Sequence, residues 1–148
     1  MDKQYVQDLF LSKIKQSVDN HKETLKELAE SAANETKSTA GDKFETALAM
    51  LQIEQAQVNK KLEELNFQLT EINQIDVTKI SSKIIIGSLV KTNNGYFYVS
   101  SALGKLLING EYVFALSVKS PLGIELMHKI KGDKITFKNT EYIILEIL

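Results

Sequence analysis

Two long stretches of the chain carry apolar residues at alternating spacings of three and four. The first runs from Asp2 to about Ala33, and the second from Asp42 to about Gln74. This heptad pattern is typical of helices that pack along a narrow apolar seam. The seam positions are Leu11, Ile14, Val18, His21, Leu25, Leu28 and Ala32 in the first stretch, and Phe44, Leu48, Leu51, Gln55, Val58, Leu62, Leu65, Leu69 and Ile72 in the second.

The two seams also predict how the helices pair. In an antiparallel hairpin, seven layers beginning with Ala32 and Phe44 have residue numbers that sum to 76, so one fold point near Ser38 aligns them all. At ~1.5 Å per residue, arms of roughly 33 residues would make a rod ~50 Å long. The polar segment 34–46 would form the tip of this rod.

From residue 75 onward the pattern changes to short β-type runs that are separated by turn signals. Residues 75–79 indicate a linker, and Asn109-Gly110 predicts a hairpin turn of type I′. Ser120-Pro121 predicts the N-cap and the first position of a short helix that reaches Met127. The predicted strands cover residues 83–92, 96–101, 105–108, 112–118, 134–137 and 142–147, with further turns at 93–95 and 132–133.

These patterns together predict an α+β chain of two domains. Residues 1–75 would form an amino-terminal antiparallel coiled-coil hairpin, and residues 76–148 a β-rich domain with one short helix. The first domain carries nine Lys against thirteen acids and the second nine Lys against six acids. An acidic hairpin argues against a protein that binds nucleic acid by neutralising phosphates.

Composition excludes several classes of function. The sequence has no cysteine and two histidines, which excludes disulfides, thiol catalysis and cysteine- or histidine-rich metal centres. Neither a Gly-rich phosphate loop nor a Ser–His–Asp arrangement can be recognised, so we expect no enzyme activity of the chain's own. No apolar run approaches ~18 residues and no basic-then-apolar amino terminus is present. We therefore expect a cytoplasmic protein without membrane contact.

Two acids stand at the predicted start of the second helix. Asp42 and Glu45 have the spacing of a capping box, in which the side chains satisfy free amides of the first helical turn. The same two carboxylates are hard oxygen ligands of the kind that Mg²⁺ prefers, and Glu35 is a third acid in the same turn. The spacing leaves both interpretations open, and the two are compatible.

Separated stretches of the chain resemble the Gre family of bacterial transcript cleavage and elongation factors. Residues 41–45, Gly-Asp-Lys-Phe-Glu, are similar to the family's tip motif Gly-Asp-Leu-Lys-Glu. Residues 75–79 resemble the segment that joins the two domains of the family, and residues 86–90 resemble its first strand. The family's Ser-Pro-Leu-Gly and Gly-Asp signature is matched by Ser120, Pro121, Leu122 and Gly123 and by Lys131, Gly132 and Asp133.

The resemblance implies a coiled coil followed by a domain of FKBP-like fold, without isomerase activity. It implies an accessory factor, expected to be a monomer, that binds RNA polymerase through the secondary channel and contacts the nascent RNA indirectly. Asp42 and Glu45 would help to hold a Mg²⁺ shared with the polymerase and so stimulate hydrolysis of backtracked RNA. The residues that would contact the polymerase are Ser120, Pro121, Leu122 and Gly123.

The tip also departs from the family pattern. The family continues Asn-Ala-Glu-Tyr after the motif, whereas residues 46–49 here are Thr-Ala-Leu-Ala, so a further acid and an aromatic residue are missing. This difference favours an alternative, a channel-binding regulator that inhibits transcription or modulates initiation without cleavage. A coiled-coil adaptor or self-association module is a further alternative, because heptad hairpins also mediate oligomerisation.

Overall fold

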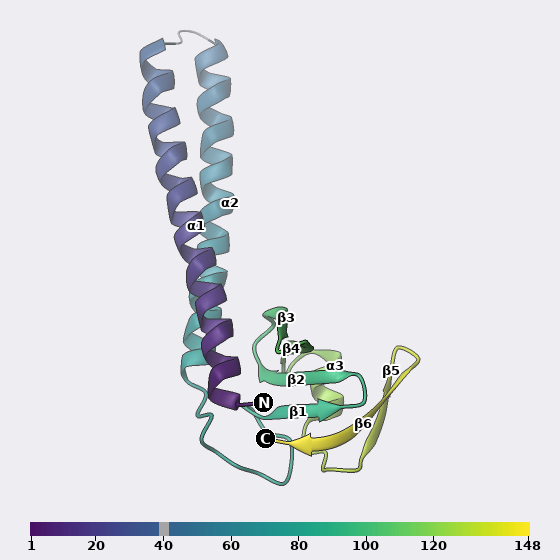
Figure 1. The fold of residues 1–148 in the computed structure, drawn as a ribbon. Helices are drawn as coiled ribbons and strands as arrows, with labels where there is room; N and C mark the ends of the chain where they lie inside the picture. Colours follow the sequence, from purple (N-terminus) through teal and green to yellow (C-terminus); the bar gives the residue numbers. More distant parts are fainter. Residues whose placement is uncertain (39–41) are drawn as a thin grey trace. The chain divides into compact units, whose positions relative to one another are not determined.

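The computed structural model describes the backbone of residues 1–38 and 42–148, and the side chains of residues 1–34 and 43–148. Two long helices, α1 (Lys3–Ser38) and α2 (Asp42–Asn73), precede a six-stranded sheet and the short helix α3 (Pro121–Leu126) (Figure 1). This arrangement confirms the predicted α+β class. The chain forms two compact units, residues 13–67 and residues 1–12 with 68–148. The predicted division after residue 75 stays a prediction.

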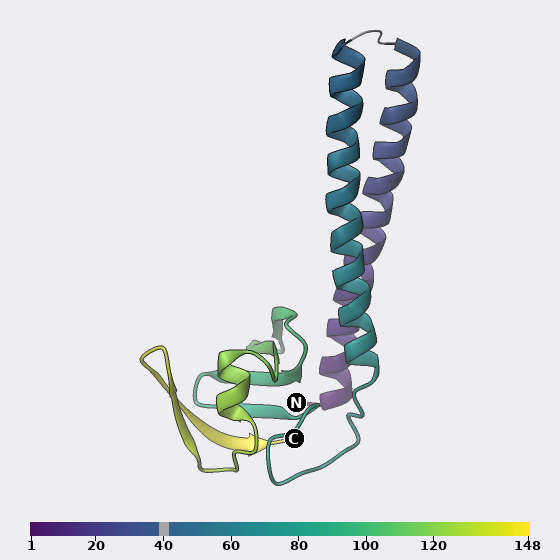
Figure 2. The same ribbon diagram turned by 180° about the vertical axis from the view of Figure 1, so that it is seen from behind.

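The unit of residues 13–67 consists of two helices that lie side by side, as both views show (Figures 1 and 2). The most deeply buried side chains of this unit are those of Ile14, Val18, Leu62 and Leu65. Every predicted seam position in this unit is at least partly buried, whereas most residues between the seam positions are exposed. The two predicted seams are therefore confirmed, because heptad positions are the ones that a helix pair removes from water.

The first helix is longer than its apolar pattern indicates. It was expected to end near Ala33 but continues to Ser38. Residues 34–38 contain neither Gly nor Pro, so the backbone carries no helix breaker although the side chains are polar. The second helix begins at Asp42 as predicted. Of the predicted tip 34–46, residues 39–41 lie outside the described residues.

The sheet has the strand order β3-β4-β2-β1-β6-β5. Neighbouring strands are antiparallel except β2 and β4, which are parallel and pair Tyr96 with Val113 and Ser100 with Ser117. The hairpin turn at Asn109-Gly110 has positive φ at both residues, as type I′ geometry requires. The strands are β1 (Leu89–Thr92), β2 (Gly95–Ser100), β3 (Gly104–Ile108), β4 (Glu111–Ser117), β5 (Lys134–Phe137) and β6 (Thr140–Ile147).

The strand β2 is buried on both faces, which explains its continuous apolar run. On one face Phe97 and Val99 pack in a core that includes Leu126 of α3. On the other face the ring of Tyr98 stacks on Phe10 of α1 at a centroid distance of 6.0 Å. The sheet therefore lies between α3 and the first turns of α1 within this unit.

One predicted strand is much shorter than expected. The apolar run 83–92 was predicted to be a single strand, but only Leu89–Thr92 belongs to β1, and Lys83 makes an isolated bridge to Ile130. Gly87 has a φ of +90°, which ends the extended conformation. The hydroxyl of Ser88 accepts a hydrogen bond of 3.0 Å from the amide of Ile85, which closes a turn at this point.

Candidate functional site

The two acids of the predicted tip lie in the first turn of α2. Asp42 is the first residue of the helix, and its side chain lies outside the described residues, as do Gly41 and the side chain of Glu35. Glu45 is exposed. The predicted capping box and Mg²⁺ ligation both need the Asp42 carboxylate, so both stay predictions. Among the described residues, no three His, Cys, Asp or Glu side chains are grouped as metal ligands.

The seam determines how Glu45 is presented. Phe44 and Leu48 are partly buried, whereas Lys43, Glu45 and Thr46 are exposed. Because residues next to a seam position are turned away from the partner helix, the burial of Phe44 directs Glu45 toward solvent. The free amides and the dipole of a helix start stabilise a carboxylate there. Glu45 is thus available to a cation or to a partner protein.

The predicted polymerase-contacting residues Ser120 to Gly123 form the start of α3. Ser120 is the N-cap: its hydroxyl oxygen accepts a bond of 3.0 Å from the amide of Gly123 and its O–H donates to the carbonyl oxygen of Ser117 at 2.7 Å. Pro121 occupies the first helical position, and Leu122 packs against the core. Contacts explain the presence of Ser120, Leu122 and Gly123 in the fold, and Pro121 has a favoured helix position. The contact of residues 120–123 with the polymerase stays a prediction.

The second half of the signature, Lys131-Gly132-Asp133, also has a structural role. Gly132 has a φ of +93° and donates its amide to the carbonyl of Ile144 at 2.8 Å. The Asp133 carboxylate accepts a bond of 2.9 Å from the amide of Ile130. These bonds hold the turn that precedes β5 against β6.

The sequence did not indicate the polar contacts that fix the end of α2. Gln7 is only 5% exposed, and its side-chain amide donates to the carbonyls of Ile72 at 2.7 Å and of Ile75 at 3.3 Å. The hydroxyl of Ser101 donates to the Glu71 carboxylate at 2.5 Å. These partners are 30 to 68 residues apart in the chain, so no local pattern could have predicted them.

The segment after α2 carries a local carboxylate turn. Asp76 accepts hydrogen bonds from the Thr78 hydroxyl at 2.6 Å and from the Thr78 amide at 3.0 Å, which hold the pKa of Asp76 below its ordinary value. The Lys3 ammonium donates to the carbonyl of Lys79 at 2.7 Å. Partial burial lowers the pKa of Lys3, and the negative charge of Asp76 acts in the opposite direction.

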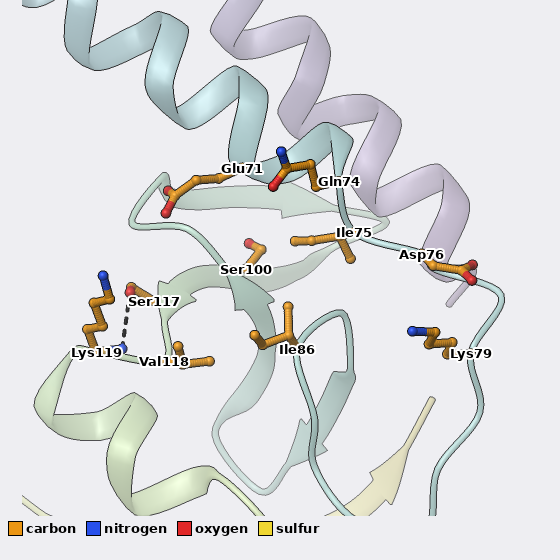
Figure 3. Close-up of a pocket in the computed structure, with 10 residues that line it drawn as sticks. All are labelled: Glu71, Gln74, Ile75, Asp76, Lys79, Ile86, Ser100, Ser117, Val118 and Lys119. Carbon is orange, nitrogen blue, oxygen red and sulfur yellow. Dashed lines mark hydrogen bonds between the residues drawn. The ribbon is translucent and has the colours of Figure 1, made fainter.

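A cavity of about 450 Å³ lies beside this segment (Figure 3). Its walls come from the end of α2, the segment after it, the loop before β1, and the ends of β2 and β4. Sequence reasoning missed this site, because its residues are spread over five separate segments. The lining residues are Glu71, Gln74, Ile75, Asp76, Lys79, Ile86, Ser100, Ser117, Val118 and Lys119.

Comparison with known proteins adds little. No protein-family model and no curated protein matches the chain. Among solved structures, the chain is similar to one described as the structure of the transcription factor Gfh1, with 19% identity over 93% of this chain and 92% of that chain and a TM-score of 0.38. A likeness of this TM-score carries no argument about function. Within the described residues, no helix combines the length and apolar character that crossing a membrane requires.

Proposed function

We propose that the chain is a Gre-type accessory factor of bacterial RNA polymerase that enters the secondary channel with its helical hairpin and stimulates cleavage of backtracked RNA. The observation that carries the proposal is the start of α2 at Asp42, within the motif Gly-Asp-Lys-Phe-Glu of residues 41–45. Both acids of the motif thereby fall in the first turn of a long helix with a paired neighbour. The matching order of the further motifs along the chain supports the same family.

The chemistry of the tip suits this role. Asp42 and Glu45 supply carboxylate oxygens, and the helix start favours their ionised forms. Mg²⁺ retains several waters and needs few protein ligands, so two carboxylates suffice when the polymerase supplies the others. A second Mg²⁺ held jointly in this way would stabilise an attacking water and the leaving oxygen in a two-metal hydrolysis. The polymerase remains the enzyme, and this chain completes its metal site.

The β-rich part of the chain would contact the polymerase at the rim of the channel. Gly123 is buried and Leu122 packs in the core, so a contact at the start of α3 would use the exposed Pro121 and the half-buried Ser120. This division restricts the predicted interface to two of its four residues.

A stalled, backtracked elongation complex tests the proposal directly. The wild-type chain should shorten the RNA, whereas a double Asp42→Ala, Glu45→Ala variant should not, because it lacks both carboxylates. The matched control is Glu54→Ala, Glu63→Ala, which removes the same charge from exposed positions of the same helix outside its first turn. Equal RNA shortening by the wild type and the tip variant would exclude the proposed role of the two acids.

One observation favours a second candidate, a channel-binding regulator without cleavage activity. In the described part of the tip, residues 43–49, Glu45 is the single acid, and Ala47 and Leu48 are partly buried. A regulator of this kind would bind the polymerase and alter transcription while the backtracked RNA stayed intact. Robust RNA shortening by near-equimolar protein would exclude this candidate. Failure to retain polymerase in a pull-down would instead favour the coiled-coil adaptor.

A further inference from the structure

The cavity beside the end of α2 opens where two neighbouring strands end. Ser100 is the last residue of β2 and Ser117 the last of β4, and the two are partners in the parallel register of these strands. The crevice at the carboxyl ends of parallel strands is a recurrent position for ligands in open sheets. A volume of about 450 Å³ lies in the range of small-molecule sites.

Four ionisable side chains line the cavity, and their formal charges cancel. In Figure 3, Glu71 and Lys119 are drawn on one side of Ser100, and Asp76 and Lys79 on the other. Within the described part of the chain, no ion pair joins any of these four side chains. Both carboxylates already accept hydrogen bonds, Glu71 from the Ser101 hydroxyl and Asp76 from Thr78, and neither is neutralised by an ion pair. The lining of each part of the cavity therefore contains one negative and one positive side chain.

The surface between these charges is apolar. Ile75, Ile86 and Val118 line it, and Ile86 remains 50% exposed. Gly87 permits the close approach of the loop before β1, because a Cβ at this position would lie 2.8 Å from Cγ2 of Ile75. An exposed isoleucine flanked by two other aliphatic side chains favours a ligand with an aliphatic body.

A buried hydroxyl adjoins the same surface. The Oγ atom of Ser100 is shielded from solvent and has no hydrogen-bond partner among the described residues. A buried polar group of this kind is stabilised by any donor or acceptor that reaches it. Because this oxygen is closed even to a molecule the size of water, the choice of ligand rests on the charged and apolar residues that line the cavity.

We propose that this cavity binds a small zwitterion with an aliphatic body, namely a free amino acid or a dipeptide. A phosphate or a polyamine carries charge of one sign, so wherever it paired with an oppositely charged lining residue it would also lie near a residue of its own sign. A zwitterion can pair with both kinds of residue. The aliphatic part covers Ile75, Ile86 and Val118. This site is separate from the tip acids, and it stands whether or not the chain acts on RNA polymerase.

The test uses four forms of one dipeptide with the isotope-labelled full chain. Leucyl-leucine is offered with free ends, with its amine acetylated, with its carboxylate amidated, and with both ends blocked, while the backbone amide signals of Ser100, Ser117 and Ile86 are followed by NMR. The free form should bind with a dissociation constant on the order of 1 mM. Blocking either end should weaken binding about fivefold, because solvent-exposed ion pairs contribute little each.

Two variants link the signal to the cavity. Ile86→Trp should fill the apolar part and abolish the titration, whereas Leu107→Trp, at an exposed position on β3, should leave it unchanged. Lys119→Ala, at another exposed residue, should weaken binding about fivefold and serves if the Ile86 variant does not fold. The proposal is overturned if no lining amide shifts through the millimolar range, if the doubly blocked dipeptide binds as well as the free one, or if the titration is insensitive to both cavity variants.

Discussion

Replacement of Gly123 by alanine sets local helix propensity against tertiary packing. Gly123 is the third residue of α3, and within a helix alanine is favoured over glycine by ~1 kcal/mol. On local grounds the substitution should therefore stabilise the chain. The structure instead predicts a loss of stability, because a Cβ at this position would lie 2.0 Å from the carbonyl oxygen of Ser117 and 2.9 Å from Oγ of Ser120.

The magnitude follows from the contacts that must yield. A separation of 2.0 Å is far inside van der Waals contact, so α3 must move away from Ser117. Such movement breaks the N-cap bond from the Gly123 amide to Ser120, which costs ~1 kcal/mol, and overpacking a core adds ~1–3 kcal/mol. After the favourable propensity of ~1 kcal/mol, a net loss of ~1–3 kcal/mol remains. For a unit of this size, this corresponds to a fall in Tm of ~5–20 °C.

Tyrosine fluorescence during urea and thermal unfolding measures this loss. The chain has no tryptophan, and all five tyrosines belong to the unit of residues 1–12 and 68–148, so their emission reports on the unit that contains α3. Ile124→Ala is the control, because Ile124 is 62% exposed on the same helix and should change stability by less than ~0.5 kcal/mol. A Gly123→Ala chain that is as stable as the wild type, or more stable, would refute the reasoning.

Two further predictions concern buried polar groups. Gln7→Ala should lower the free energy of unfolding by ~1–3 kcal/mol, because the carbonyl of Ile75 loses the Gln7 donor and the carbonyl of Ile72 keeps only the amide of Ile75; an unchanged urea midpoint would contradict these bonds. Tyr98→Phe should stabilise the chain by ~1 kcal/mol at pH 7, because the buried phenol oxygen has no partner among the described residues. Burial also raises the pKa of Tyr98, so above pH ~10 the folded chain keeps a phenol proton that the unfolded chain loses. The wild type should therefore lose further stability relative to the variant above pH ~10. Stability curves of the two proteins that stay parallel across this pH range would contradict the prediction.

The parts of the fold that the sequence predicted correctly are those with local causes. The heptad seams follow from side-chain periodicity, and the cap at Ser120 follows from adjacent residues. The prediction of one long strand over 83–92 was wrong. Three consecutive isoleucines at 84–86 have high strand propensity. The positive φ of Gly87 and the exposure of Ile86 depend instead on how this loop packs against Ile75. Strand propensity reflects how well a residue fits a pleated sheet, so it cannot predict a turn that is stabilised by a contact with a distant residue.

The candidate sites divide in the same way. The start of α2 at Asp42 could be predicted from sequence, because a helix start has a residue signature of its own, whereas the functional role of the acids there stays a prediction. The cavity cannot be found, because Glu71, Ser100 and Lys119 meet only after the sheet and the end of α2 have packed together. The contact of Gln7 with the end of α2 spans 65 residues and depends on the same packing.

The motifs that resemble the Gre family do not all carry the same weight for function. Ser120 caps α3, and the carbonyl of Ser117 leaves no room for a side chain at position 123. This fold therefore needs both Ser120 and Gly123, whatever the chain binds. The signature in the β-rich part therefore argues mainly for a shared structure. The proposed function rests on Asp42 and Glu45, whose spacing predicts no role in the fold beyond a helix cap. A cap requires one acceptor, and aspartate or serine meets that need equally well. If Asp42→Ser keeps the hairpin stable but loses RNA shortening, the carboxylate serves the metal rather than the helix.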